Sequence, residues 1–134
     1  MKNDDITFGE RKLLSSIKAL PGIYIGSKNL SNLEHFIHGY DTAMLFLGIN
    51  DKHVIIPEGM QEYVESKYNV SHYTTKSYFS IMAENSDDEE QAFELFFDVL
   101  DEYLLSIDRE VLPAWNDAKD SIKQIKALLS LSSG

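Results

Sequence analysis

The chain has 134 residues, 43% of them hydrophobic, and carries a formal net charge of −10 at pH 7. This length and apolar content suit one helical domain, residues 1–134, with a single buried core, and they exclude a globally disordered chain. Because the sequence holds no cysteine, disulfides, thiolate metal sites and cysteine nucleophiles are excluded as well. The first residues lack the apolar core of a secretion signal, and no apolar run is long enough to span a membrane, so we expect a cytoplasmic protein.

The first predicted helix begins at a capping box, in which the side chains of Thr7 and Glu10 satisfy free backbone amides. A Pro-Gly pair ends this helix. Residues 22–26 follow as an apolar stretch between two glycines. We expect this stretch to form a tight turn that Ile23 and Ile25 anchor in the core.

A second capping box, at Ser31, opens a longer predicted helix, and Gly48 stands where a left-handed C-terminal cap is wanted. Its apolar residues at helical spacing are Leu33, Phe36, Ile37, Tyr40, Met44 and Leu47. Residues 54–56 are β-branched and suit either a short strand or a buried loop. Pro57 fits the first turn of the helix that we expect next.

Residues 70–83 fit two patterns, because their apolar side chains alternate as in a strand but also match one or two helical turns. We favour a short helix here. A third capping box, at Ser86, opens an acidic, strongly apolar helix that we expect at the centre of the bundle. A terminal helix from Trp115 to Leu129 precedes a frayed tail at residues 130–134. These elements predict an all-α, single-domain bundle of about five helices with at most one short β segment.

The charge imbalance is confined to residues 84–110, which hold eleven carboxylates and one base, whereas the rest of the chain holds eleven of each. Scattered charge would serve solubility equally well, so this concentration favours a basic partner and disfavours binding of nucleic acid. Helical spacing leaves four of the carboxylates together on one exposed stripe: Glu90, Glu94, Asp98 and Asp101. Carboxylates four residues apart stand about 6 Å apart along a helix, close to the separation of successive phosphates in a nucleic acid.

Motifs for catalysis and cofactor binding are missing from the sequence. There is no nucleophile elbow, no glycine-rich phosphate loop and no pair of zinc-binding histidines around a glutamate. His35 and His38 lie three residues apart on one predicted helix, but they lack the carboxylate partners that metal-binding bundles use. We therefore expect no enzymatic activity, no cofactor and no metal site.

Four stretches of the chain carry a family resemblance: PGIYIGS at residues 21–27, NLSNLEHFIHGY at 29–40, DDEEQAFELFF at 87–97 and LDEY at 100–103. Together they resemble small bacterial immunity proteins that are encoded beside polymorphic or contact-dependent growth inhibition toxins. The resemblance spans about residues 8–105 and consists mainly of packing and capping residues. It implies a protein that binds a toxin and has no catalytic residues of its own.

We expect the protein to bind and neutralise a cognate toxin domain, a basic protein of nuclease type, by occluding its active site or substrate groove. The acids expected to contact the partner are Glu90, Glu94, Asp98, Asp101 and Glu102, and the expected aromatic anchors are Tyr68, Tyr73 and Tyr78. Two alternatives stay open: an acidic adaptor or regulatory protein that docks another basic protein, and a ligand- or metal-binding helical bundle.

Overall fold

The computed structural model describes residues 8–48 and 54–113, together with residues 123, 126, 127, 129 and 130. Its helices are α1 (Phe8–Ala19), α2 (Pro21–Tyr24), α3 (Leu30–Phe46), α4 (Met60–Lys67), α5 (Tyr78–Glu84) and α6 (Glu89–Ser106). No strand occurs in these described parts of the chain. The predicted all-α class is therefore confirmed, and residues 54–56 form a loop instead of a strand, with Ile55 and Ile56 buried and Val54 partly exposed.

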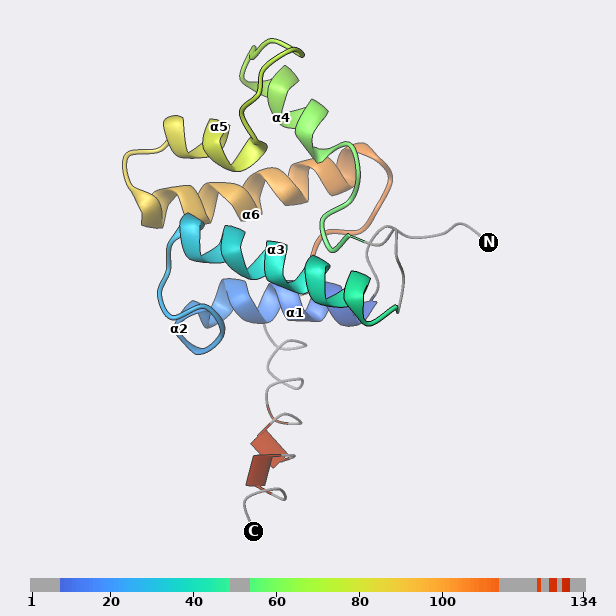
Figure 1. Ribbon diagram of the computed structural model, residues 1–134. Helices are drawn as coiled ribbons and strands as arrows, with labels where there is room; N and C mark the ends of the chain where they lie inside the picture. Colours follow the sequence, from blue (N-terminus) through green and yellow to red (C-terminus); the bar gives the residue numbers. More distant parts are fainter. Residues whose placement is uncertain (1–7, 49–53, 114–122, 124–125, 128, 131–134) are drawn as a thin grey trace.

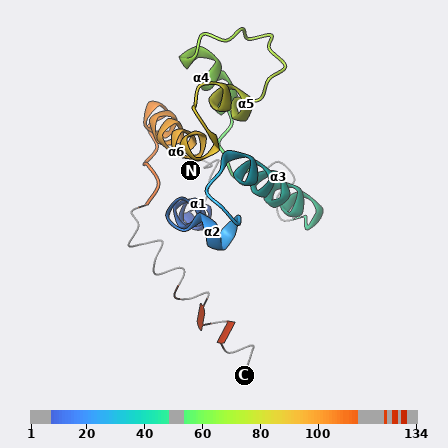
Figure 2. The ribbon, with the colours of Figure 1, turned by 90° about the vertical axis from the view of Figure 1, so that its left-hand side faces the viewer.

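The helices are arranged around α6, which crosses the middle of the molecule (Figure 1). The contacts of α6 are with α3, α4 and α5. Seen nearly along α6, the helices α4 and α5 lie on one side of the α3 and α6 pair, and α1 and α2 lie on the other (Figure 2). One flank of α6 is left open by this arrangement.

The helix α6 supplies the largest share of the core, as its sequence predicts. Its buried residues are Ala92, Phe93, Phe96, Phe97, Val99, Leu100, Tyr103 and Leu104. Burying one such large apolar side chain stabilises the fold by about 1.5–3 kcal/mol. Because these residues cover most of the circumference of α6, little of its surface is left for charged residues; Glu89 accepts a hydrogen bond from the Ser31 amide of α3 at 2.8 Å, and Glu90, Glu94 and Asp98 are exposed.

Helix α3 begins earlier than its predicted capping box, and helix α6 begins later. In α3 the cap is Asn29, whose side chain accepts a hydrogen bond from the Asn32 amide at 2.7 Å, and not Ser31. In α6 the cap is Asp88, which accepts from the Gln91 amide at 2.8 Å. Ser86 is unsuited to that role because its hydroxyl donates to the Met82 carbonyl at the end of α5.

Three predictions about individual residues near turns are wrong. Ile23 does not anchor the turn after α1, because the residue is 62% exposed, although Ile25 does pack against the core. Leu47 lies at the end of α3 and is 69% exposed. Pro57 is buried in the connection before α4 and does not occupy the first helical turn. Gly48 has a φ of +69°, which confirms the predicted left-handed position.

The predicted short helix in residues 70–83 is present as α5, although it begins only at Tyr78. The capping box at Thr7 and most of the predicted terminal helix, including Trp115, lie outside the described residues. So do residues 131–134 of the predicted tail. The described residues of the terminal segment, 123, 126, 127, 129 and 130, are helical, so the prediction that Ser130 begins the frayed tail is wrong.

The connection before α4 requires glycine at position 59. Gly59 has a φ of +95°, and a Cβ atom added there would overlap the Tyr103 hydroxyl and lie 3.2 Å from the ring carbon that carries it. This hydroxyl also donates to the Glu58 carbonyl, so it is held in place. The C-terminal half of α6 thus fixes the backbone of residues 58–59.

We expect Gly59→Ala to lower the free energy of unfolding by at least about 2 kcal/mol, because a left-handed alanine and the overlap with Tyr103 add their costs. Gly39→Ala is the matched control. Gly39 lies in the middle of α3 with nothing within 4 Å of an added Cβ atom, so this change should stabilise the protein by about 0.5–1 kcal/mol. Urea unfolding of both variants measures the difference, and equal stabilities would contradict the expected strain at Gly59.

Candidate functional site

The open flank of α6 carries the five predicted partner-binding acids, which we call the acidic surface: Glu90, Glu94, Asp98, Asp101 and Glu102. The side chains of Glu90 and Glu94 are 66% and 58% exposed, and Asp98 is exposed as well. These three residues lie on successive turns of α6. The packed face on the other side of the helix holds them in position.

Lys28, in the loop before α3, reaches the first part of the acidic surface. Its ammonium group pairs closely with Glu94 and lies 3.9 Å from Glu90. The hydrogen bond to Glu94 raises the pKa of Lys28 above its ordinary value. The sequence does not predict this partner, because Lys28 and Glu94 are 66 residues apart in the chain and meet only in the folded protein.

A hollow of about 320 Å³ lies beside Lys28 and contains both signs of charge. Its lining consists of Lys18, Lys28, Phe93, Glu94, Phe97 and Asp98. The Lys18 ammonium also lies 6.0 Å from the centre of the Phe97 ring, at the limit of a cation–π contact. The acidic surface is therefore bordered by two lysines on the side that faces α1.

Asp101 and Glu102, the last two acids of the surface, take part in contacts within the fold. The Asp101 carboxylate accepts a hydrogen bond from the Leu112 amide at 3.2 Å, which ties the segment after α6 to the helix. Glu102 accepts from Tyr63 at 3.2 Å and pairs with Lys67 of α4 at 2.9 Å. The hydrogen bond from Lys67 lowers the pKa of Glu102, and the same bond raises the pKa of Lys67.

The charge of residues 84–110 is reduced by the fold but not cancelled. Four bases from other segments lie within 4 Å of its carboxylates: Arg11, Lys28, Lys67 and Lys76. Counting only bases among the described residues, these four and Arg109 set five positive charges against eleven carboxylates, a difference of −6. Asp98 forms no ion pair with any described residue.

The three predicted tyrosines do not share one surface. Tyr68 ends α4 and packs, half-buried, against the core. Tyr78 opens α5, where its ring stacks on Phe79 with 4.5 Å between the centroids. Tyr73 is 91% exposed in the loop between α4 and α5 and is the one of the three that fully presents its ring to solvent.

Side chains of α4 hold this loop to the bundle. The Gln61 amide donates to Glu65 and to the Lys76 carbonyl, both at 2.9 Å, and its oxygen accepts from the Tyr78 amide at 2.8 Å. The buried Glu65 carboxylate also lies 3.3 Å from the His72 ring nitrogen. The loop that carries Tyr73 is therefore tied at both ends.

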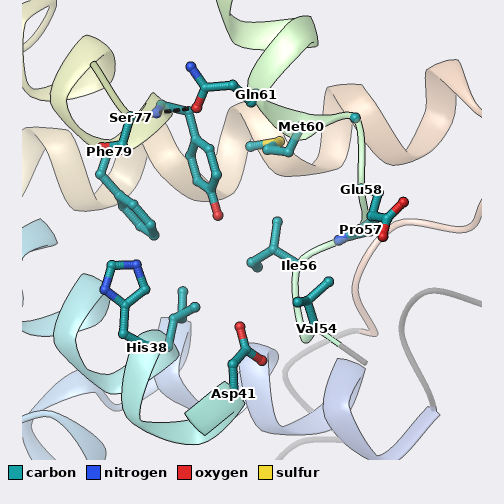
Figure 3. Close-up of a pocket in the computed structure, with 13 residues that line it drawn as sticks. His38, Asp41, Val54, Ile56, Pro57, Glu58, Met60, Gln61, Ser77 and Phe79 are labelled. Carbon is teal, nitrogen blue, oxygen red and sulfur yellow. Dashed lines mark hydrogen bonds between the residues drawn. The ribbon is translucent and has the colours of Figure 1, made fainter. Parts of the chain in front are cut away.

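A cavity of about 270 Å³ lies between α3, residues 54–61 and the start of α5 (Figure 3). Of its thirteen lining residues, three belong to α3, seven to residues 54–61 and three to residues 77–79. His38 and Asp41 lie on the α3 side of the cavity, and Glu58 lies in the 54–61 segment with its exposed carboxylate directed away from the other lining side chains (Figure 3). The sequence did not predict this cavity, because its walls come from segments that are far apart in the chain.

Metal-binding and membrane-spanning features are missing from the residues that the structure describes. No group of three or more histidine, aspartate and glutamate side chains there is arranged to hold a metal ion. His35 and His38 are both exposed on α3. None of the helices in the described ranges is both long and apolar enough to cross a membrane.

Comparison of the chain with protein-family models, with curated proteins and with solved structures found no match. The function is therefore inferred from the geometry of the molecule itself.

The ion pair of Glu102 predicts how the stability of the protein depends on pH. Since the pKa of Glu102 is lowered in the folded state, its contribution to stability is present above the ordinary value of 4.5 and is lost as the pH falls through the folded value. Its side chain is 46% exposed, so solvent screening limits the contribution to about 0.2–1 kcal/mol.

We expect Glu102→Gln to lower the free energy of unfolding by about 0.2–1 kcal/mol at pH 7. This difference in stability from the parent protein should disappear at acidic pH. Asp98→Asn removes an equal charge from the same helix without breaking an ion pair among the described residues. Urea unfolding at pH 7 and at pH 3 measures both variants. A penalty for Glu102→Gln that persists unchanged at pH 3 would contradict the assignment.

Proposed function

We propose that this protein is an inhibitor that binds a basic toxin domain, of nuclease type, through the acidic surface of α6. The observation that carries the proposal is the exposed row Glu90, Glu94 and Asp98 on a helix whose other faces are packed. The packed helix fixes the backbone that carries these carboxylates, so little backbone entropy is lost on binding.

The residual negative charge of the surface accelerates encounter with a basic partner, since complementary charge raises association rates. A nuclease is the partner class that we favour, because its groove is basic in order to hold a phosphate backbone. Carboxylates on successive turns stand about 6 Å apart and offer such a groove a series of anions. Binding there would exclude the nucleic acid.

The ion pairs between Lys28 and the acidic surface are compatible with this role. Both partners are partly exposed, and exposed pairs of this kind are worth about 0–1 kcal/mol. A cation of the binding partner can therefore displace Lys28 from Glu94 at small cost.

Tyr73 offers a second type of contact. Its ring is almost fully exposed, and the loop that carries it is tied to α4 by Gln61 and Glu65. Tyrosine is among the residues that most often dominate the binding energy of an interface. We assign Tyr73 to the interface as an aromatic contact beside the charged one.

The test requires the partner itself, obtained by affinity capture from the native host or as the basic domain encoded beside the gene. An inhibitor should recover one such domain at equal stoichiometry and abolish its toxicity when the two are expressed together. Recovery of a basic protein whose activity is unchanged would favour the adaptor alternative instead.

For the captured partner, we expect Glu94→Lys/Asp98→Lys to slow association at least about tenfold at low salt, because the steering charge is reversed. Glu62→Lys/Glu84→Lys is the matched control: it changes the net charge equally and also breaks one exposed ion pair, that of Glu84 with Lys76. Stopped-flow mixing measures the rates, and circular dichroism verifies the fold. Equal rates for the two double variants would refute the role of the acidic surface.

A further inference from the structure

We propose that the cavity between α3, residues 54–61 and α5 binds a small uncharged molecule, an apolar ring that carries one hydrogen-bond acceptor for the Tyr78 hydroxyl. This site is separate from the proposed inhibitor function, because the lining belongs to α3, the 54–61 segment and residues 77–79, whereas the acidic surface lies on α6. Three features of the lining select this ligand: apolar walls, polar groups that are already used within the fold, and a hydroxyl that has no partner.

The apolar walls set the body of the ligand. Four buried hydrophobic residues line the cavity, each of them 5% exposed or less: Ile37, Ile56, Met60 and Phe79. Ile56 and Phe79 lie on opposite sides of the space (Figure 3). Its volume of about 270 Å³ exceeds the roughly 150 Å³ of an apolar cavity that holds benzene in another protein. One ring with a short substituent therefore fits, and a charged group would lose its hydration against these walls.

Most polar side chains of the lining are engaged elsewhere, so they offer a charged ligand little. The Ser77 hydroxyl caps α5, and the side-chain amide of Gln61 is hydrogen-bonded through both its nitrogen and its oxygen. The Asp41 carboxylate accepts from the Ile55 amide at 2.9 Å, and the exposed carboxylate of Glu58 is directed away from the other lining side chains (Figure 3). The thirteen lining residues, all of them described, include neither lysine nor arginine. The lining therefore favours an uncharged ligand.

The Tyr78 hydroxyl is the polar group that a ligand can use. It makes no hydrogen bond to any residue that the structure describes, although the hydroxyl groups of tyrosines taken out of bulk water usually find a partner. In the described part of the chain, no polar side-chain atom is both shut off from solvent and without a hydrogen bond. The hydroxyl of this partly buried lining residue is therefore accessible to a molecule that enters the cavity.

The surroundings of the Tyr78 hydroxyl make it a hydrogen-bond donor. Burial raises the pKa of Tyr78, and the carboxylates of Asp41 and Glu34 raise it further. Both acids belong to α3, so the hydroxyl, which is carried by α5, lies toward the opposite side of the cavity. A hydroxyl that stays protonated beside negative charge donates its hydrogen, and its complement in a neutral ligand is an acceptor such as a carbonyl oxygen.

The ring that carries this hydroxyl is held in place by other aromatic side chains. Tyr78 stacks on Phe79 with 4.5 Å between the centroids, and Phe79 stacks on the core residue Phe96 with 5.6 Å between the centroids. His38 packs edge to face against Phe79 from α3, with 6.0 Å between the ring centroids. The aromatic wall is therefore formed before a ligand binds, and little side-chain entropy is lost on binding.

Four probes of similar size test the site on the full chain: acetophenone, which has a carbonyl acceptor, ethylbenzene, which has none, and the charged benzylammonium and benzoate ions. In titrations followed by ¹⁵N-resolved NMR, both neutral probes should shift residues 37–41, 54–61 and 77–79. Both ions should have a Kd at least about tenfold above that of acetophenone, because the walls do not replace their hydration. Failure of both neutral probes to bind, shifts elsewhere, or an ion that binds as tightly as acetophenone would overturn the proposal.

A matched pair of tyrosine variants tests the hydrogen bond. Tyr78→Phe removes the donor and keeps the ring that stacks on Phe79, so the variant should fold. It should raise the Kd of acetophenone about three- to tenfold and leave that of ethylbenzene unchanged or lower. Tyr73→Phe removes an exposed hydroxyl outside the cavity and should change neither value. An unchanged Kd of acetophenone in Tyr78→Phe, or an equal rise for both neutral probes, would overturn the assignment of the hydroxyl as the donor.

Discussion

The packing of aromatic side chains along α6 is the constraint on which both candidate sites depend. Phe93, Phe96 and Phe97 are at most 1% exposed, and Phe97 contacts both of the others edge to face, while Phe96 stacks on Phe79 of α5. These contacts fix the rotation of α6 about its axis and the position of α5 against it. Glu90, Glu94 and Asp98 are consequently exposed on the open flank, and Tyr78 is held in the wall of the cavity.

The acidic segment is stabilised by cations that the chain brings from elsewhere. Like charges on successive helical turns disfavour an isolated helix by a few tenths of a kcal/mol per pair, and α6 tolerates them because its core face is so large. Lys28 and Lys67 lessen the repulsion at two places along the helix. The exposed pairs are weak enough to exchange with other cations, so the carboxylates serve both the fold and the proposed binding function.

Local sequence patterns predicted the helices well but could not predict the contacts between helices. Apolar residues at helical spacing revealed the central helix, since packing makes that spacing necessary. The sequence does not show which of several nearby polar residues will cap a helix: the Ser86 hydroxyl donates to the Met82 carbonyl of α5, and Asp88 caps α6 instead. Ile23 was taken for a core residue because apolar character alone does not decide burial in a turn of four residues. The Lys28 ion pair and the cavity depend on tertiary contacts, which no local pattern encodes.

The overlap between position 59 and the Tyr103 hydroxyl has a consequence for how this fold can evolve. The two positions are 44 residues apart in the sequence but share one small volume. A smaller side chain at position 103 would create room for a Cβ atom at position 59. Conversely, any residue larger than glycine at position 59 requires a smaller side chain at position 103. Substitutions at these two places should therefore covary among any relatives, with glycine accompanying the bulky aromatic residue.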